Sequence, residues 1–385
     1  MSDRTERPTA DEPNATTGTT GPVEAAPSAT GRAEQVVEIT KSGRAGRPAT
    51  GGGEPLLEVR DLAVEFRTRE GVARAVNGVN YSVHAGETLA VLGESGSGKS
   101  VTAQAIMGIL DTPPGRIAGG EIRFRGEDLL TLSEDKRRAI RGDRIAMIFQ
   151  DALSSLNPVL SVGYQLGEMF RVHRGASRRE ARERAVDLME RVRIPAARER
   201  VNDYPHQFSG GMRQRIMIAM ALALEPDLII ADEPTTALDV TVQAQVMELL
   251  AELQREFHMG LILITHDLGV VADVADRIAV MYAGRIVETA PVKELYAAPA
   301  HPYTKGLLES IPRLDHKGKE LYAIKGLPPS LTALPTGCSF HPRCPMATER
   351  CTTERPPLHT VLDASEAPVE GRGSACHYWK ETLHG

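Results

Sequence analysis

The sequence predicts an α/β fold in which helices cover a largely parallel β-sheet. Short strand-like runs, such as ETLAVLG, RIAMIFQ and DLIIADE, alternate with helical patterns from Leu56 to about Ala290. A glycine-rich segment joins one apolar run to a helical pattern, and two acidic residues follow another run. Acids at the carboxyl edge of a parallel sheet face the ligand crevice, so we expect a binding site there.

The chain of 385 residues divides into three parts by composition. Residues 1–53 are rich in Thr, Ala, Pro and Gly and predict a disordered N-terminal tail, because they cannot bury enough apolar surface to offset the entropy of ordering. Residues 54–300 carry the α/β pattern. Residues 301–385 contain many prolines, which disfavour long helices and central strands, and they predict a separate extension with little regular structure.

Apolar periodicity places two helices in the α/β region. One covers Thr241 to Phe257, where apolar residues spaced three and four apart form a stripe that ends before Gly260. The other covers about Ser177 to Val192 and has apolar residues on one face. We expect both stripes to belong to the core.

Composition also excludes several classes of protein. The 45 Lys and Arg are interspersed among 51 Asp and Glu, and the net charge is −6, so the chain lacks the concentrated basic face that nucleic-acid binding requires. No run of roughly 18 apolar residues occurs, so we expect no transmembrane helix. The N-terminus has no apolar segment of the secretory type. We therefore expect a cytoplasmic protein, in which disulfides are disfavoured.

The segment GESGSGKS, Gly93–Ser100, fits the pattern GxxxxGK[ST] and lies between the strand-like ETLAVL and the helical VTAQAIMGIL. Glycines let backbone N–H groups turn toward phosphates, and the helix N-terminus adds partial positive charge. Lys99 would reach the β- and γ-phosphates, and the Ser100 hydroxyl would ligate Mg²⁺. The alternative is a glycine-rich turn without a ligand, which the strand–turn–helix context disfavours.

The strand-like run DLIIADEP ends in Asp232 and Glu233. Asp232 would hold Mg²⁺ through water, and Glu233 would act as the base that polarises the water attacking the γ-phosphate. Acids after a strand more often cap a helix or lie in a solvated turn. The neighbouring phosphate loop favours the catalytic interpretation.

A second candidate anion site lies at FSGGMRQ, where Ser209, Gly210 and Gly211 precede an apolar helix. A helix N-terminus of this kind offers a hydroxyl and unhindered backbone donors. Alone, the segment is better explained as a serine N-cap followed by two flexible glycines. Together with Gln150 after RIAMIF and His266 after GLILIT, the pattern is more specific.

In this order the motifs resemble those of the ATP-binding-cassette (ABC) ATPases over nearly all of residues 56–290. The resemblance implies a P-loop ABC nucleotide-binding domain at 54–300 with a helical subdomain at about 151–215. It implies that Glu233, His266 and Gln150 take part in ATP hydrolysis, and that Ser100, Gln150 and Asp232 hold Mg²⁺. The nucleotide contacts that it implies are Gly93, Ser95, Gly96, Ser97, Gly98, Lys99, Ser100 and Val101 of the Walker A loop, Phe66 on the adenine, Ser209, Gly210, Gly211 and Gln214 of the signature, and Asp239 of the D-loop, Ala237–Asp239.

One residue of the signature departs from the family pattern, and the role of one aromatic residue has two alternatives. Met212 replaces the usual glutamine of the signature, but its serine and glycines remain, so we expect nucleotide contact to survive. Phe66 either stacks on adenine or belongs to the core. In the family, the signature of one chain closes over ATP held by the Walker A loop of another, so the resemblance implies that two cassettes sandwich two nucleotides.

The extension resembles the C-terminal region of the ATPase subunits of bacterial oligopeptide and dipeptide importers, through HPYTKGLLESIP, LYAIKGLPPSL and PTGCSFHPRCPMATERC. The resemblance implies an ATPase that powers peptide uptake, with Mg²⁺ and ATP bound. The implied partners are a second, related ABC ATPase subunit, two transmembrane permease subunits and, through these, an extracellular peptide-binding protein, with no nucleic acid. The region from DALSSLNPV to about Val201 would contact a permease. The implied location is the cytoplasmic face of the plasma membrane.

Two other functions stay open from the sequence. The importer branch includes transporters of nickel and other small solutes, which share much of the extension. A soluble ABC ATPase acting on nucleic acid is the more distant alternative, and it would need tandem cassettes, inserted coiled coils or a basic face.

The chain has four cysteines, all close to its end in a region too poor in core to order itself. Disulfides fit the even number but conflict with the compartment. Zinc sites usually contain a close C-x₂₋₄-C pair, which is absent, whereas a [4Fe–4S] cluster accepts ligands from irregular loops, and some members of this importer branch resemble that case. We favour [4Fe–4S], with zinc or no metal as alternatives. The proposed ligands are Cys338, Cys344, Cys351 and Cys376, and His341, His359 and His377 could substitute for them.

Overall fold

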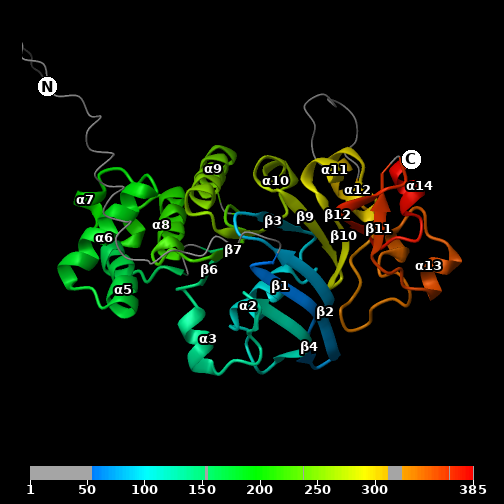
Figure 1. Ribbon diagram of the computed structural model, residues 1–385, viewed down its shortest axis with the longest axis horizontal. Coiled ribbons are helices and arrows are strands. Elements are labelled where there is room, and N and C mark those ends of the chain that lie inside the picture. Colours follow the sequence, from blue (N-terminus) through cyan, green and yellow to red (C-terminus); the bar gives the residue numbers. More distant parts are fainter. Residues whose placement is uncertain (1–53, 152–154, 237, 311–322, 364, 385) are drawn as a thin grey trace, which may run out of the picture. The chain divides into compact units, whose positions relative to one another are not determined.

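The computed structural model describes residues 54–151, 155–236, 238–310, 323–363 and 365–384 (Figure 1). The expected tail, residues 1–53, and Ala237 of the expected D-loop lie outside the described residues. Residues Gly52–Gly385 form one compact unit. Within the described ranges, no helix combines the length and apolar character needed to cross a membrane.

A four-stranded antiparallel sheet opens this unit, in the order β2-β1-β4-β5. Its inward residues on β1, such as Leu57, Leu62 and Val64, are fully buried, and they pack with helix α2 and the strands of the second sheet in one core cluster. The sheet therefore covers one side of the phosphate loop's helix. The bounds are β1 Leu57–Thr68, β2 Gly71–Val83, β4 Gly115–Phe124, β5 Glu127–Asp128 and α2 Lys99–Met107.

The second sheet has eight strands in the order β11-β12-β10-β9-β3-β8-β7-β6, and its centre is parallel. Strands β3, β7 and β8 are buried along their whole length, because layers cover both faces of the sheet. The predicted parallel α/β core is therefore confirmed. The bounds are β3 Thr88–Leu92, β6 Ile145–Ile148, β7 Leu228–Asp232, β8 Gly260–Ile264, β9 Arg277–Tyr282 and β10 Arg285–Pro291.

Both helices expected from periodicity are confirmed. Helix α9 spans Val240–Phe257 and buries the predicted stripe, and α6 spans Arg178–Arg191 after a capping box formed by Ser177 and Glu180. Figure 1 shows α5, α6, α7 and α8 gathered at one end of the unit. The other helices here are α3 Glu134–Ile140, α5 Val162–Arg174, α7 Ala197–Arg200, η2 Pro205–Gln207, α8 Gly210–Leu222, α10 Leu268–Val274 and α11 Val292–Ala297.

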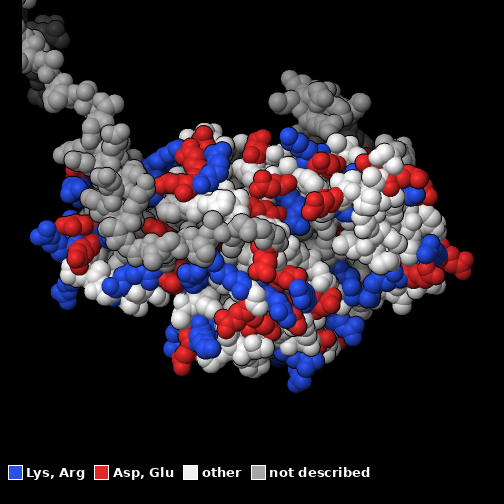
Figure 2. All heavy atoms as spheres, in the orientation of Figure 1, with Lys and Arg blue, Asp and Glu red and all other residues white. Residues whose placement is uncertain are grey.

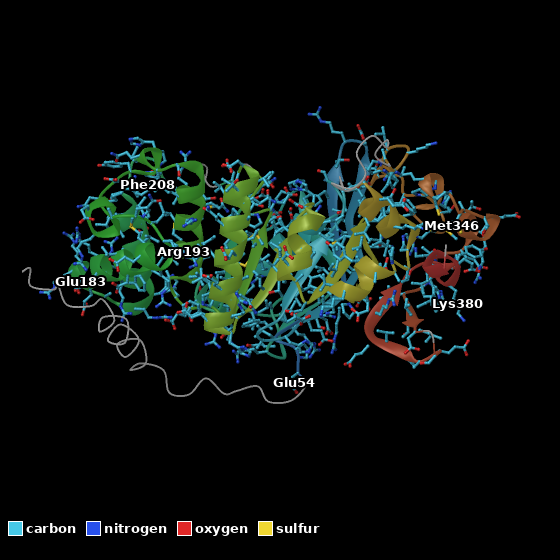
Figure 3. All side chains as sticks on the ribbon, turned by 90° about the horizontal axis from the view of Figure 1, so that it is seen from above. Glu54, Glu183, Arg193, Phe208, Met346 and Lys380 are labelled. Carbon is cyan, nitrogen blue, oxygen red and sulfur yellow. The ribbon has the colours of Figure 1, made fainter. Side chains whose placement is uncertain are left out.

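The C-terminal extension adds strands to the main sheet, so backbone hydrogen bonds join it to the preceding α/β region. Strand β12 pairs with β10 through Glu288↔Ser374 and Thr289↔Gly373. Figure 3 shows Met346 and Lys380 of the extension at the opposite end of the unit from Glu183 and Phe208. The elements are short, as the prolines predicted: α12 Pro302–Glu309, η3 His341–Arg343, α13 Glu349–Thr353, β11 His359–Leu362, β12 Pro368–Ser374 and α14 Trp379–His384.

The charged side chains on the face drawn in Figure 2 are mixed in sign, with Lys and Arg beside Asp and Glu. Ion pairs among the described residues include Arg191 with Glu256 at 2.7 Å and Arg116 with Glu65 at 2.8 Å. This face therefore offers no continuous basic surface, in agreement with the composition.

Candidate nucleotide site and cysteine cavity

The phosphate loop connects β3 to α2 and needs glycine at two close approaches. Gly93 has φ 148°, and a Cβ there would lie 2.2 Å from the Met281 carbonyl oxygen. Gly98 has φ 105°, and a Cβ there would lie 2.4 Å from the Ala75 carbonyl oxygen. Any side chain at either position would push the loop away from the sheet. The loop thus ends directly at the N-terminus of α2, where backbone N–H groups are unpaired.

Two polar groups of the loop are placed for an anion. The Lys99 ammonium, only 5% exposed, donates to the carbonyl oxygens of Gly93 and Glu94 at 2.8 and 3.0 Å. Burial lowers the pKa of Lys99, and nearby carboxylates oppose this shift. The Ser97 hydroxyl is buried and has no hydrogen-bond partner among the described residues. Since buried polar groups normally have partners, the Ser97 hydroxyl fits a phosphate that would supply one, and the neighbouring Lys99 ammonium supplies positive charge.

The expected magnesium ligands Ser100 and Asp232 lie together although 132 residues separate them. The Ser100 hydroxyl donates to an Asp232 carboxylate oxygen at 3.0 Å. Burial raises the pKa of Asp232, and the Ser100 hydrogen bond acts in the opposite direction. A hydroxyl and a carboxylate beside a phosphate site are the oxygen ligands that Mg²⁺ prefers, so this pair fits the ion.

The residues expected to act in hydrolysis converge on one carboxylate oxygen, Oε2 of Glu233. The Gln150 side-chain amide donates to it at 2.9 Å, the Thr236 hydroxyl donates at 2.8 Å, and His266 Nδ1 lies 3.5 Å away. Glu233 itself has φ 46°, a left-handed conformation that is strained for a residue with a side chain. Sequence analysis missed Thr236, whose only signal is its position three residues after the base.

The signature and D-loop residues begin two helices. The Ser209 hydroxyl accepts from the Met212 N–H at 3.3 Å and caps α8, and the Asp239 carboxylate accepts from the Val242 N–H at 3.0 Å and caps α9. A Cβ on Gly211 would lie 2.5 Å from a Val242 methyl carbon, so the starts of the two helices are packed together. The free N–H groups of α8 remain available to an anion.

Three residues predicted to contact nucleotide, Gln214, Phe66 and Val101, are buried or packed against the core. Gln214 is 3% exposed, and its side-chain amide nitrogen has no partner within the described ranges, so it does not reach the surface that Gly210 presents. Phe66 packs against the core beside Gly115, where an added Cβ would lie 3.0 Å from its ring. Val101 also packs partly against this core, whereas Ser95 and Gly96 are exposed.

All four cysteines of the extension are free thiols that line one small cavity, together with His341 and His377. The cavity has about 10 Å³ of space, roughly that of one water molecule. His359, the third histidine considered, does not line it and lies on β11. No group of three or more His, Cys, Asp or Glu within the described ranges is arranged to hold a metal ion.

One thiol of this cavity receives a backbone hydrogen bond, because the Tyr378 N–H donates to Cys376 Sγ at 3.3 Å. Burial nevertheless raises the pKa of Cys344 to about 11 and that of Cys376 to about 12, and the neighbouring cysteines add to these shifts. Cysteine thiols are the ligand type that iron–sulfur clusters use, but a cavity of about 10 Å³ has no room for a cluster in the arrangement described.

Comparison with known sequences finds two families. The family described as "ABC transporter" matches residues 76–236, and the one described as "Oligopeptide/dipeptide transporter, C-terminal region" matches residues 287–351. The oligopeptide transport ATP-binding protein OppD of Bacillus subtilis (strain 168) is 55% identical over 309 residues, covering 80% of this chain and 86% of its own. The dipeptide transport ATP-binding protein DppD of the same organism is 52% identical over 314 residues, covering 80% and 94%.

Similar solved structures are ABC cassettes. The ATP-binding cassette MJ0796, as a dimer in a post-hydrolysis state with ADP and Pi, has a TM-score of 0.55 at 29% identity and covers 61% of this chain and 98% of its own. CbiO1 from Clostridium perfringens, part of the transporter complex cbiONQ, has a TM-score of 0.54 at 31% identity and covers 64% and 92%.

Proposed function

The chain belongs to the ABC transporter family, in the branch of the oligopeptide and dipeptide transport ATPases, and from this premise we propose how its residues do their work. It is the ATP-hydrolysing subunit of a peptide importer, which couples ATP hydrolysis to uptake through permease subunits. The residue roles and the partner details below are our proposals. The functional division that we propose is a cassette at 54–300, with its helical subdomain at about 151–215, and an extension at 301–385.

The Walker A loop binds the triphosphate of ATP. Its glycines bring the N–H groups at the start of α2 to the phosphates, and the Ser97 hydroxyl gains the partner that it lacks. Lys99 exchanges two backbone carbonyls for phosphate oxygens, which are stronger acceptors because they are charged. Ser100, Asp232 and Gln150 would hold Mg²⁺, which neutralises phosphate charge when bound.

Glu233 is the general base. The observation that carries this proposal is the convergence of Gln150, Thr236 and His266 on one of its carboxylate oxygens. These contacts orient the carboxylate, so that its other oxygen can take a proton from water in line with the γ-phosphate. His266 is close enough to respond to the γ-phosphate that enters and leaves the same place.

Two cassettes close around the nucleotides. The unpaired N–H groups at Ser209, Gly210 and Gly211 suit the γ-phosphate held by a partner cassette, with Asp239 beside them and Phe66 on the adenine. The buried Gln214 supports α8 from inside. We propose a related, non-identical ABC subunit as the partner. The dimeric form of the similar cassette MJ0796 supports the pairing of two cassettes.

The helical subdomain contacts the permeases. Three large apolar side chains are exposed on or beside α5: Val159 at 75%, Val172 at 71% and Tyr164 at 46%. Exposed apolar side chains in one region favour a protein interface. We place the subunit at the cytoplasmic face of the membrane, bound through two transmembrane permeases, with an extracellular peptide-binding protein acting on the far side. Nucleic acid is not a partner in this proposal.

The test of the transport function is reconstitution. The chain is co-expressed with a second cassette and two permeases and is purified from membranes, and phosphate release is measured with and without peptide-loaded binding protein. We expect assembly and peptide-stimulated hydrolysis, and a Glu233→Gln complex that assembles without hydrolysis. A chain that purifies with nucleic acid and without permeases would overturn the proposal.

The cysteine cavity holds a [4Fe–4S] cluster with a structural role, and zinc is the alternative occupant. Support comes from the four thiols on one cavity and from the Tyr378 N–H group that donates to Cys376 at 3.3 Å. Anaerobic purification followed by iron and sulfide analysis tests the proposal. We expect about four irons per chain, and a colourless, iron-free protein with intact ATPase activity would remove the cluster.

A further inference from the structure

A residue of the cysteine-bearing extension is paired with the phosphate loop. Arg343 donates through two nitrogens to the two carboxylate oxygens of Glu94, at 2.6 and 2.9 Å. Glu94 is the second residue of the Walker A segment, and 249 residues separate it from Arg343. A fork of this kind fixes both the position and the plane of the carboxylate.

The Arg343 side chain is enclosed at this contact. It is only 4% exposed, and its other contacts are with the Tyr282 hydroxyl at 3.4 Å and with backbone carbonyls of the extension. The hydrogen bonds to Glu94 raise the pKa of the guanidinium, so it stays charged. An enclosed pair of this type constrains its surroundings more than an exposed pair does, because loss of one partner leaves the other charge buried.

The backbone of Glu94 is held from the same side. Its N–H donates to the Tyr303 hydroxyl at 2.9 Å, and Tyr303 is fully buried on α12. The Tyr303 ring lies 4.7 Å from that of Tyr282 and 5.3 Å from that of Phe340, which precedes the turn carrying Arg343. One aromatic cluster thus supports both groups that bind Glu94.

The position of Glu94 matters because its carbonyl oxygen organises the rest of the loop. That oxygen accepts from the Ser97 N–H at 3.2 Å and from the Lys99 ammonium at 3.0 Å. A shift of Glu94 would therefore move the acceptor of the residue that binds the phosphates. Neither Arg343 nor Tyr303 has been given a part in nucleotide binding by the motifs above.

We propose that Arg343 is a positioning residue for the Walker A loop, through which the extension sets the affinity for ATP. The inference rests on the proposed nucleotide site. Arg343 does not touch the phosphates in this arrangement and acts only through Glu94. Because Arg343 ends the turn His341–Arg343, which lies between Cys338 and Cys344, the ordering of the cysteine cavity and that of the phosphate loop are joined at one residue.

Steady-state kinetics on the reconstituted complex test the proposal. We expect Arg343→Ala to raise the KM for ATP about tenfold, equivalent to about 1.4 kcal/mol, and to leave kcat at saturating ATP within about twofold. A lower kcat with an unchanged KM would show a merely structural role and would overturn the proposal. Arg343→Lys keeps the charge without the fork, so an intermediate KM is expected.

Arg350→Ala is the matched control. Arg350 lies in the same extension and pairs with Glu354 at 2.8 Å, but both side chains are more than half exposed. Its KM should equal that of the unmodified protein. An equal rise in KM for both variants would assign the effect to general loosening of the extension and contradict a specific role of Arg343.

Two further variants keep the test decisive if Arg343→Ala folds poorly. Tyr303→Phe removes one hydroxyl and keeps the ring, and we expect its KM for ATP to rise about threefold.

Glu94→Gln combined with Arg343→Met should have a KM for ATP no higher than that of the poorer single variant, since both substitutions act through one contact. Fully additive effects would refute the shared contact. Failure of the unmodified complex to bind ATP would instead refute the proposed nucleotide site itself.

Discussion

The nucleotide site and the cysteine cavity differ in where their polar groups find partners. At the nucleotide site the partners are side chains brought from distant elements, as in Ser100 with Asp232, 132 residues apart, and Gln150 with Glu233, 83 residues apart. In the cavity, the Cys376 thiol accepts from the N–H group of Tyr378, only two positions later. The first site is therefore assembled by contacts across the whole fold. The cysteine cavity consists of locally ordered loops. We expect the metal cluster proposed there to link these loops through its cysteine ligands.

The largest effect expected from this comparison is on catalysis at the preassembled site. Glu233→Gln removes the base and keeps the shape, so phosphate release should fall by about 10²- to 10⁴-fold, while binding of a fluorescent ATP analogue persists. The iron content of the cysteine cavity should not change, since Glu233 does not line that cavity. Unchanged turnover would mean that another residue is the base.

The second effect concerns the locally ordered site. Cys376→Ser removes one of the four proposed ligands, and we expect the iron content to fall from about four per chain to near zero, with faster proteolysis of the extension. Turnover at saturating ATP should change by less than about twofold, because the catalytic side chains have their partners elsewhere. Ser330→Ala, in the same extension but away from the cavity, serves as the control. Full iron retention in Cys376→Ser would contradict the four-cysteine set.

The third prediction concerns Glu288 on β10, where strand β12 of the extension pairs with the main sheet. Glu288 is fully buried on β10 and accepts from the N–H groups of Ala300 and His301 at 2.6 and 3.0 Å. Burial raises its pKa from 4.5 to about 7, against these hydrogen bonds and Arg372. Between these two values the unfolded chain loses a proton that the folded chain keeps, so the contribution of Glu288 to stability is present below about pH 4.5 and is lost as the pH rises to about 7.

Denaturant titrations at several pH values from 4.5 to 7.5 give the free energy of unfolding of the unmodified protein and of Glu288→Gln. The quantity compared is the first free energy minus the second. This difference should fall with rising pH by on the order of 2–3 kcal/mol. A difference that is constant over this range would show that Glu288 titrates normally.

The smallest expected effect is a difference in stability between two glycine-to-alanine variants in the extension. Both glycines have positive φ, but only one position is sterically crowded. Gly337 and Gly326 both have positive φ, 65° and 81°, but a Cβ on Gly337 would lie 2.4 Å from the Cys351 carbonyl oxygen, whereas on Gly326 the nearest atom is 3.6 Å away in the Arg343 side chain. Gly337→Ala should therefore destabilise the extension by about 1–2 kcal/mol more than Gly326→Ala. Thermal unfolding of the two variants provides the measurement, and equal melting temperatures would contradict the predicted clash.

Sequence reasoning was most successful where a motif states both residue types and spacing. The phosphate loop follows from GESGSGKS, and the structure places Ser100 beside Asp232 as the motif implies. Gln214 was predicted to contact nucleotide, and its side chain is buried; the helical period alone does not show which side of α8 faces the subdomain core. The four cysteines could be counted, but their convergence on one cavity depends on loops without periodicity.

Two features of the extension could not be predicted for physical reasons. Strand β12 contains Pro368, Gly371 and Gly373 and resembles a loop in sequence, but the exposed edge of β10 gives it a partner. The pairing of Arg343 with Glu94 joins a proline-rich turn to a loop 249 residues away, and no local pattern carries that information.

The pairing of β12 with β10 has a practical consequence for anyone who wants to handle the cassette as an interchangeable module. A chain cut at the end of β10 would leave hydrogen-bonding groups of Glu288 and Thr289 without their strand partner and would expose an apolar, β-forming edge to neighbouring molecules. Such a fragment should precipitate or pair with itself during expression. Swapping the catalytic half between transporters would therefore require moving the C-terminal strands with it.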